Sequence, residues 1–122
     1  GMIGSRKIDF DDLLKETKKI FKCGSIKYTQ VLNKKVEKIA VCGGSGSFLT
    51  KDAIRSGADV FITSDFKYHD FFEANNQITL IDIGHYESEQ FTKDLIFEFL
   101  NKNLVNIALH LSNENTNPIK YF

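Results

Sequence analysis

The fold class of this chain is indicated most clearly by the segment Ile78-Thr79-Leu80-Ile81-Asp82-Ile83-Gly84-His85-Tyr86-Glu87-Ser88-Glu89. Its first six residues form an apolar run of the length of a buried strand, and the residues after Gly84 open a segment with helical periodicity. A strand that passes directly into a helix is the repeating step of an α/β protein. The turn between the two lies at the carboxyl end of the strand, where open α/β sheets bind their ligands.

The same alternation of strands and helices continues along most of the chain. Strands are expected over residues 26–31, 36–42, 59–63, 77–83 and 105–111, and helices over residues 10–21, 48–56, 66–73 and 85–101. The linker of four residues between the first two strands favours a hairpin. In the last helix, a stripe formed by Phe91, Leu95 and Phe99 is expected to face the core. The pattern predicts an α/β three-layer sandwich with a mostly parallel or mixed sheet.

Length and composition indicate one globular domain. The 122 residues are 42% hydrophobic and 26% charged, and no apolar run is long enough to cross a membrane. Cys23 and Cys42 follow no metal-binding or redox spacing and are expected to be reduced thiols. With no signal peptide in view, the expected location is the cytoplasm. Residues 112–122 are polar and rich in turn formers, which predicts an extended C-terminal tail.

Charge is distributed unevenly along a chain whose formal net charge is zero. Residues 1–40 carry ten Lys and Arg against five Asp and Glu, but most lysines of the first helix fall on its solvent side or last turn. Nucleic acid is therefore not the expected partner. Residues 65–98 hold eight carboxylates and two histidines against two lysines, a field that favours cations.

The strongest candidate for metal chemistry is the pair His85 and Glu89. Their spacing of four residues places an imidazole and a carboxylate on one helix face, as two ligands of one ion require. The alternative is an ion pair on a solvated helix. Spacing by itself does not separate the two interpretations.

Asp65 and His69 repeat this pairing in reverse order after an earlier strand. Asp65 could bind a metal or orient a ligand, and His69 could donate or accept a proton near neutral pH. The alternatives are a helix N-cap for Asp65 and a surface or supporting role for His69. A third histidine, His110, alternates within an apolar run and is interpreted as a strand residue without a functional role.

A glycine-rich loop, Gly43-Gly44-Ser45-Gly46-Ser47, follows another expected strand. Its Gly44, Ser45, Gly46 and Ser47 could contact a phosphate or substrate through backbone N–H groups, or the loop could simply be a tight turn that needs positive φ. It matches neither a Walker loop nor a dinucleotide fingerprint. An esterase that uses Ser45 is disfavoured because the last glycine of the nucleophile elbow is replaced by Ser47.

Several motifs together resemble one known family over nearly the whole chain. They are Val41 to Ser47, Gly57-Ala58-Asp59-Val60, Thr63-Ser64-Asp65-Phe66-Lys67-Tyr68-His69-Asp70, Ile83 to Glu89 and the ending Asn117-Pro118-Ile119-Lys120-Tyr121-Phe122. In order and spacing they resemble the C-terminal half of the Nif-three-like family, whose members are also labelled dinuclear metal centre or type two GTP cyclohydrolase-like proteins. Gly1-Met2-Ile3-Gly4 resembles an internal motif of that family, which implies that the chain is one lobe of a larger protein.

The resemblance implies two related α/β lobes that face each other across two divalent metal ions, assembled into hexamers. The C-terminal metal ligands of the family fall on His85 and Glu89. Asp65, Lys67, Tyr68 and His69 match the motif that lines the same cleft, with Ser64 where many members have glycine. The remaining ligands, a histidine pair and an aspartate of the N-terminal lobe, have no counterpart in this chain.

The expected function is therefore that of the metal-binding lobe of a dinuclear-metal protein. The resemblance implies a metal-dependent, GTP cyclohydrolase-like hydrolase of a nucleotide-like or phosphorylated small molecule, with zinc, iron or manganese bound. His69 and Asp65 are the expected catalytic residues. The expected partners are the missing N-terminal lobe and further copies of the protein. The alternative is a metal-loaded assembly or regulatory protein without turnover.

Overall fold

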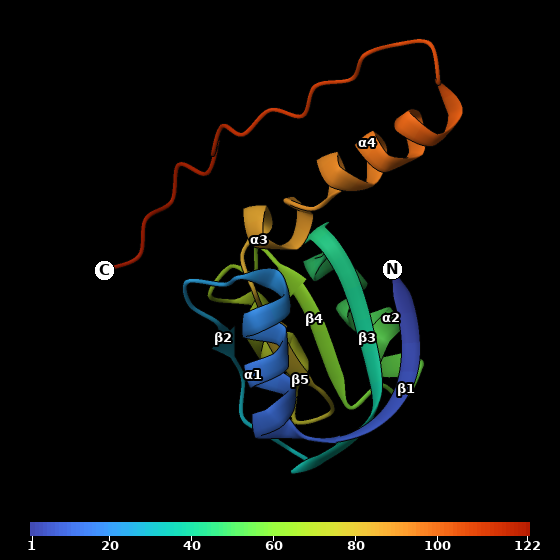
Figure 1. The fold of residues 1–122 in the computed structure, drawn as a ribbon. Coiled ribbons are helices and arrows are strands. Elements are labelled where there is room, and N and C mark those ends of the chain that lie inside the picture. Colours follow the sequence, from blue (N-terminus) through green and yellow to red (C-terminus); the bar gives the residue numbers. More distant parts are fainter.

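A five-stranded mixed sheet forms the centre of the computed structural model, which describes all residues from 1 to 122 (Figure 1). The strands follow the order β1-β3-β4-β5-β2. Their bounds are β1 Met2–Asp9, β2 Lys27–Tyr28, β3 Lys35–Ser45, β4 Val60–Ser64 and β5 Thr79–Asp82. β3, β4 and β5 run parallel to one another. The two edge strands are antiparallel to their neighbours: β1 pairs with β3, and β2 pairs with β5. The carboxyl ends of the three central strands therefore meet at one edge of the sheet.

Helix α1, Phe10–Phe21, covers one face of the sheet. Its Phe10 and Leu13 are buried against a cluster of β-branched side chains that point to the same face: Val36, Val60, Ile62, Ile81 and Ile83. The alternation along β4 explains this placement, because Val60 and Ile62 face α1 while Phe61 between them faces the other side. The expected first helix is confirmed. It ends at Phe21, and its C-cap residue Lys22 adopts a left-handed conformation.

The opposite face is covered by helix α2, Thr50–Arg55, and by the 3-10 helices η1, Ser47–Leu49, and η2, Asp70–Ala74. A second apolar cluster fills this side: Ala40, Ala53, Ala58, Phe61, Phe66, Ala74, Ile78 and Leu80. Helices on both faces of a mixed sheet confirm the predicted three-layer α/β architecture.

Two features of the sheet differ from the sequence-based expectation. The predicted hairpin between residues 26–31 and 36–42 is wrong, because β2 pairs with β5 at one end of the sheet while β3 lies between β1 and β4. The N-terminal strand β1 was not expected. Its side chains are almost all exposed, so an edge strand of this kind carries little apolar signal.

The C-terminal part also differs from expectation. The predicted helix over residues 85–101 is two helices, α3 His85–Glu89 and α4 Thr92–Asn103, and the predicted strand over residues 105–111 does not form. α4 extends away from the sheet and has no buried residue, so the expected core stripe is wrong for this chain (Figure 1). Leu95 and Phe99 are 68% and 66% exposed. His110 is exposed outside any strand, and residues 112–122 run back without helix or strand.

None of the helices combines the length and the apolar character that crossing a bilayer requires.

Candidate metal centre

The candidate residues come together at the carboxyl edge of the three central strands. Gly44 lies near the end of β3, and Asp65 directly follows β4. His85 is the first residue of α3, which begins shortly after the end of β5. Because parallel strands place their carboxyl ends side by side, residues twenty or forty positions apart in sequence meet here. This edge is the expected place for a ligand site.

His85 is held between two carboxylates. Its Nδ1 atom lies 2.6 Å from Asp65 Oδ2, and its Nε2 atom lies 3.2 Å from Glu89 Oε2. The three side chains remain about half exposed, so the site is open to solvent. The hydrogen bond to Asp65 raises the pKa of His85 above its ordinary value, against the effect of partial burial, and the charges of Asp65 and Glu89 add to the rise.

Asp65, which contacts His85, has an unusual backbone conformation. Its φ is 62°, in the left-handed region that few residues other than glycine adopt, although aspartate tolerates it better than most. Such conformations persist where the surrounding structure fixes them and are frequent at functional sites. The helix N-cap considered for Asp65 is not what the structure shows, since the next helical segment, η2, begins at Asp70.

Gly44 makes room for Glu89. It has a φ of 64°, and a Cβ atom at this position would overlap Glu89 Oε1 and lie 3.6 Å from His85 Cε1. Only glycine combines this backbone conformation with this close approach. The glycine therefore leaves free the volume in which the His85 and Glu89 side chains meet.

Hydrogen bonds tie the glycine loop to the neighbouring strand and helix. The N–H of Gly44 donates to Ser88 Oγ over 2.7 Å, and Ser88 Oγ donates in turn to the carbonyl of His85 over 2.8 Å. The carbonyl of Gly44 accepts from the hydroxyl groups of Thr63 and Ser64. These bonds fix α3 against β3 and β4. The sequence alone does not indicate this role of Ser88, because a serine inside a short helix carries no distinctive pattern.

The glycine loop begins later along the chain than expected. β3 continues to Ser45, so Gly43 and Gly44 belong to the strand and the expected strand end at Cys42 is wrong. Gly46 is buried against Thr63, and Ser47 opens the single turn η1. With the N–H of Gly44 already bound to Ser88, phosphate contact by Gly44, Ser45, Gly46 and Ser47 stays a prediction.

His69 lies apart from this group. Its exposed ring packs edge-on against Tyr68, with ring centroids 5.3 Å apart, and lies near Phe72. No hydrogen bond joins it to Asp65, His85 or Glu89. It shares the loop after β4 with Asp65, and its role as a proton carrier stays a prediction.

A further carboxylate on α3, which no sequence pattern indicates, is buried beside the site. Glu87 is 3% exposed, and its Oε1 atom accepts hydrogen bonds from Tyr121 Oη over 3.1 Å and Asn117 Nδ2 over 3.4 Å. Burial raises the pKa of Tyr121, and the bond to Glu87 raises it further, so this phenol is a proton donor at neutral pH. Nothing in the local sequence marks Glu87, because a glutamate on a short helix is usually exposed.

Two pockets adjoin the candidate centre. The first, about 560 Å³, contains His85 and Glu89 and is walled by Lys93 and by tail residues from Ser112 to Ile119. A smaller one of about 300 Å³ contains Asp65, His85 and the ion pair that Lys27 Nζ makes with buried Asp82 over 2.9 Å. The first is large enough to hold a small molecule.

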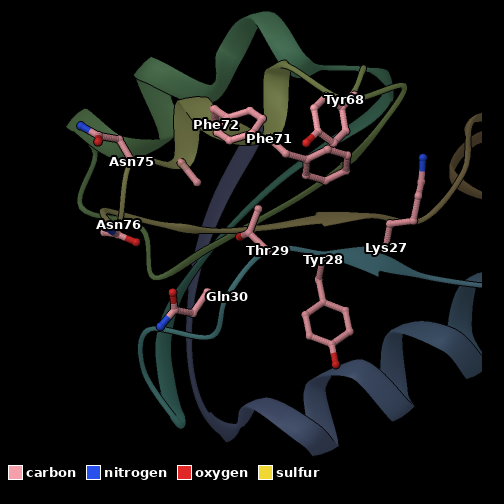
Figure 2. Close-up of a pocket in the computed structure, with 10 residues that line it drawn as sticks. Lys27, Tyr28, Thr29, Gln30, Tyr68, Phe71, Phe72, Asn75 and Asn76 are labelled. Carbon is pink, nitrogen blue, oxygen red and sulfur yellow. The ribbon is translucent and has the colours of Figure 1, made fainter.

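A third pocket, of about 590 Å³, lies between the edge of the sheet at β2 and the η2 region (Figure 2). Phe71 and Tyr68 form one side in the view, Thr29 lies across from them, and Asn75 and Asn76 stand at the far end. The lining contains no histidine and no carboxylate, so this pocket is not the metal centre in spite of its volume. It adjoins the 300 Å³ pocket through Lys27, which lines both.

The donor set fits part of a metal site. Imidazole nitrogen and carboxylate oxygen are ligands for zinc, iron and manganese, and the space beside Gly44 accommodates them together. No group of three His, Cys, Asp or Glu side chains in this chain is arranged to hold an ion by itself. His85 and Glu89 therefore have the chemistry of two metal ligands, and an ion bound there would need further ligands.

An α/β lobe with one imidazole and two carboxylates gathered at its sheet edge is the class that this geometry defines. The DUF34/NIF3 (NGG1p interacting factor 3) family model matches residues 1–118, and the chain belongs to that family. It is similar to a protein of Staphylococcus aureus named "GTP cyclohydrolase 1 type 2 homolog", with 33% identity over 119 residues, 94% of this chain and 32% of the relative. The Staphylococcus epidermidis protein of the same name is 34% identical over 99% of this chain and 35% of its own length.

Solved structures agree with this family membership. Staphylococcus aureus protein SA1388 superposes with a TM-score of 0.82 at 31% identity, covering 98% of this chain and 41% of that one. A Bacillus cereus protein related to NIF3 gives a TM-score of 0.80 at 25% identity, covering 98% of this chain and 35% of that one. The chain thus spans about a third of the length of the curated relatives it matches.

Proposed function

We propose that this chain is the C-terminal, metal-binding lobe of a dinuclear-metal protein, and that the complete protein is a metal-dependent hydrolase of a nucleotide-like or phosphorylated small molecule. The observation that carries the proposal is that His85 contacts both Asp65 and Glu89, and that Gly44 leaves space for the His85 and Glu89 side chains. The name "GTP cyclohydrolase 1 type 2 homolog" given to relatives supports a nucleotide-like substrate.

Each residue has a distinct role in this proposal. His85 Nε2 and the Glu89 carboxylate provide ligand atoms from one helix face. Asp65 accepts the Nδ1 proton of His85, which fixes the tautomer that leaves Nε2 free for a metal. Bound divalent ions of zinc, iron or manganese would supply Lewis acidity and a coordinated water of lowered pKa. His69, exposed on the loop after β4, carries a proton between the site and solvent.

The remaining ligands come, in this proposal, from an N-terminal lobe of the same protein that faces the carboxyl edge of the sheet. The exposed apolar side chains of α4, such as Leu95, Ile96 and Phe99, support contact with this lobe or with further copies in a hexamer. A cytoplasmic location completes the proposal.

Metal analysis of the full-length, two-lobed protein tests the ligand assignment. We expect the double variant His85→Ala and Glu89→Ala to lose at least half of the bound metal, because each change removes a proposed metal ligand. His110→Ala is the matched control, since this histidine is exposed and makes no hydrogen bond. An unchanged number of metal ions per chain in the double variant would show that His85 and Glu89 are not metal ligands.

A second candidate function is a metal-loaded assembly or regulatory protein without turnover, which the exposed apolar face of α4 favours. A screen of nucleotides and phosphoesters with the metal-loaded protein separates the two. Turnover that is lost in His69→Ala and kept in His110→Ala supports the hydrolase. Absence of turnover together with partner binding that survives metal removal supports the regulatory role.

A further inference from the structure

Glu87 is the buried member of a helix whose other acidic residue is exposed. It is 3% exposed, while the side chains of His85 and Glu89, two residues to either side, are 50% and 52% exposed. Removing a carboxylate from water is unfavourable unless hydrogen-bond donors replace the lost water. The partners of Glu87 therefore determine whether α3 can keep its place.

Both side-chain donors to Glu87 come from the C-terminal segment. Tyr121 Oη lies 3.1 Å and Asn117 Nδ2 lies 3.4 Å from Glu87 Oε1. The other oxygen, Oε2, has no hydrogen-bond partner and lies against Gly84, where a Cβ atom would overlap it. Gly84 has a φ of 89°, so this turn accepts the buried carboxylate only because it is glycine.

The segment is packed as well as hydrogen-bonded. The ring of Tyr121 lies so close to Gly24, just beyond α1, that a Cβ atom there would overlap it. A further bond from Gln90 Nε2 to the carbonyl of Phe21, 2.7 Å long, ties the end of α3 to the end of α1. Tyr121 thus bridges the α1 end of the lobe and the helix that carries the metal-ligand pair.

The same segment encloses the candidate centre. Residues from Ser112 to Ile119 form one wall of the 560 Å³ pocket that holds His85 and Glu89. Lys93 Nζ donates to the carbonyl of Ser112 over 2.9 Å and fixes the start of this wall to α4. Asn117, which bonds to Glu87, also lines the pocket.

We propose that residues 112–122 form a structural wall of the metal centre, and that Glu87 is the positioning residue through which Asn117 and Tyr121 hold α3 and its ligands His85 and Glu89 in place. The metal part of this proposal rests on the proposed function above. The reason for such an anchor is the length of α3, since a helix of five residues has no stability of its own and takes its orientation from tertiary contacts.

Hydrogen exchange on the metal-free chain tests the anchor without reference to metal. In Tyr121→Phe the ring is kept and only the hydroxyl is lost. We expect the α3 amides of Ser88 and Gln90, which bond to Gly84 and Tyr86, to exchange on the order of fivefold faster. Tyr28→Phe is the control, because its hydroxyl makes no hydrogen bond. Unchanged α3 exchange in Tyr121→Phe would overturn the anchor.

Cobalt substitution of the full-length protein tests the positioning role. We expect Tyr121→Phe and Glu87→Gln to change the visible absorption bands of bound cobalt and to speed its release by about 10-fold or more, with Glu98→Gln on α4 as the exposed control. Altered α3 exchange with an unchanged cobalt spectrum and release rate would overturn the positioning role. If the unmodified protein binds no metal but Tyr121→Phe still loosens α3, the proposed function fails and the anchor stands.

Discussion

The Nδ1 atom of His85 lies 2.6 Å from the Oδ2 atom of Asp65, although the two residues are 20 positions apart and follow different strands. This bond directs the other ring nitrogen toward Glu89. In many metal sites, a carboxylate that accepts a hydrogen bond from one imidazole nitrogen orients the histidine so that the other nitrogen can bind the ion.

Loss of the orienting carboxylate should weaken metal binding without removing a metal ligand. We expect Asp65→Ala to lower the affinity of the two-lobed protein for zinc or cobalt by about 10- to 100-fold, because the tautomer and ring orientation of His85 are no longer fixed. Isothermal titration with each metal measures the change. Asp11→Ala, an exposed carboxylate of α1 with no hydrogen bond, is the control and should bind as tightly as the unmodified protein.

A methyl group at Gly44 should disturb the fold and the site together. Gly44→Ala combines unfavourable positive φ with an overlap at Glu89, whereas Gly57→Ala meets positive φ alone, since no atom lies within 4 Å of its added Cβ. We expect Gly57→Ala to reduce the free energy of unfolding by about 1 kcal/mol and Gly44→Ala by about 2 to 4 kcal/mol. Urea denaturation provides both values, and equal effects would contradict the close contact with Glu89.

Stability should depend on pH through Asp59. Burial raises the pKa of Asp59, but hydrogen bonds from the N–H groups of Glu37 and Lys38 and from Asn33 outweigh it, so the folded-state pKa lies below the ordinary value. The stabilisation that ionised Asp59 gives to the fold is therefore complete above the pKa of about 3.9 that an aspartate has in the unfolded chain. It is lost as pH falls through the lower pKa of Asp59 in the folded chain.

Replacement by asparagine should remove this dependence. We expect Asp59→Asn to be less stable than the unmodified chain at pH 7, with a difference that shrinks below pH 4. Denaturant unfolding at pH 7, 4 and 3 measures it. A difference that is constant over this range would show that ionised Asp59 does not stabilise the fold.

The two cysteines should differ in reactivity. Burial raises the pKa of Cys23 to about 11, with the charge of Glu87 adding to the rise, so its thiol is protonated at neutral pH. Cys42 is only partly buried. At pH 8 we expect a disulfide reagent to label Cys42 at least 10-fold faster than Cys23, with the difference disappearing in denaturant. Comparable rates in the folded chain would contradict the burial of Cys23.

Polar substitutions on α4 should leave the stability of the lobe intact and reduce its association. Leu95 and Phe99 are mostly exposed, so Leu95→Ser with Phe99→Ser should change the free energy of unfolding by less than about 0.5 kcal/mol. Analytical ultracentrifugation should show weaker self-association of this variant. A large loss of stability would mean that α4 packs on its own lobe.

The elements of the core were predictable because their signals are local. β4 and β5 are short apolar runs, and α1 repeats its apolar residues at helical spacing, so each pattern predicts the element and the face that it buries. The spacing of His85 and Glu89 similarly placed both on one face of a helix.

The two elements whose prediction failed did so for different reasons. β1 is exposed along nearly all of its length, and the stripe on α4 has the same apolar pattern as a core helix although nothing in this chain covers it. Periodicity reports that a face is apolar, and it does not report which surface will cover that face.

Local sequence patterns were therefore enough to predict the α/β class, the order of the central strands and helices along the chain, and the placement of His85 and Glu89 on one helix face. Three relationships are visible only in the folded chain: β2 lies beside β5, Asp65 contacts His85, and Tyr121 donates a hydrogen bond to Glu87. The physical reason is the same for all three. Local propensities act over a few residues, whereas pairings between distant residues depend on how the parallel strands align and on which buried polar groups must find partners.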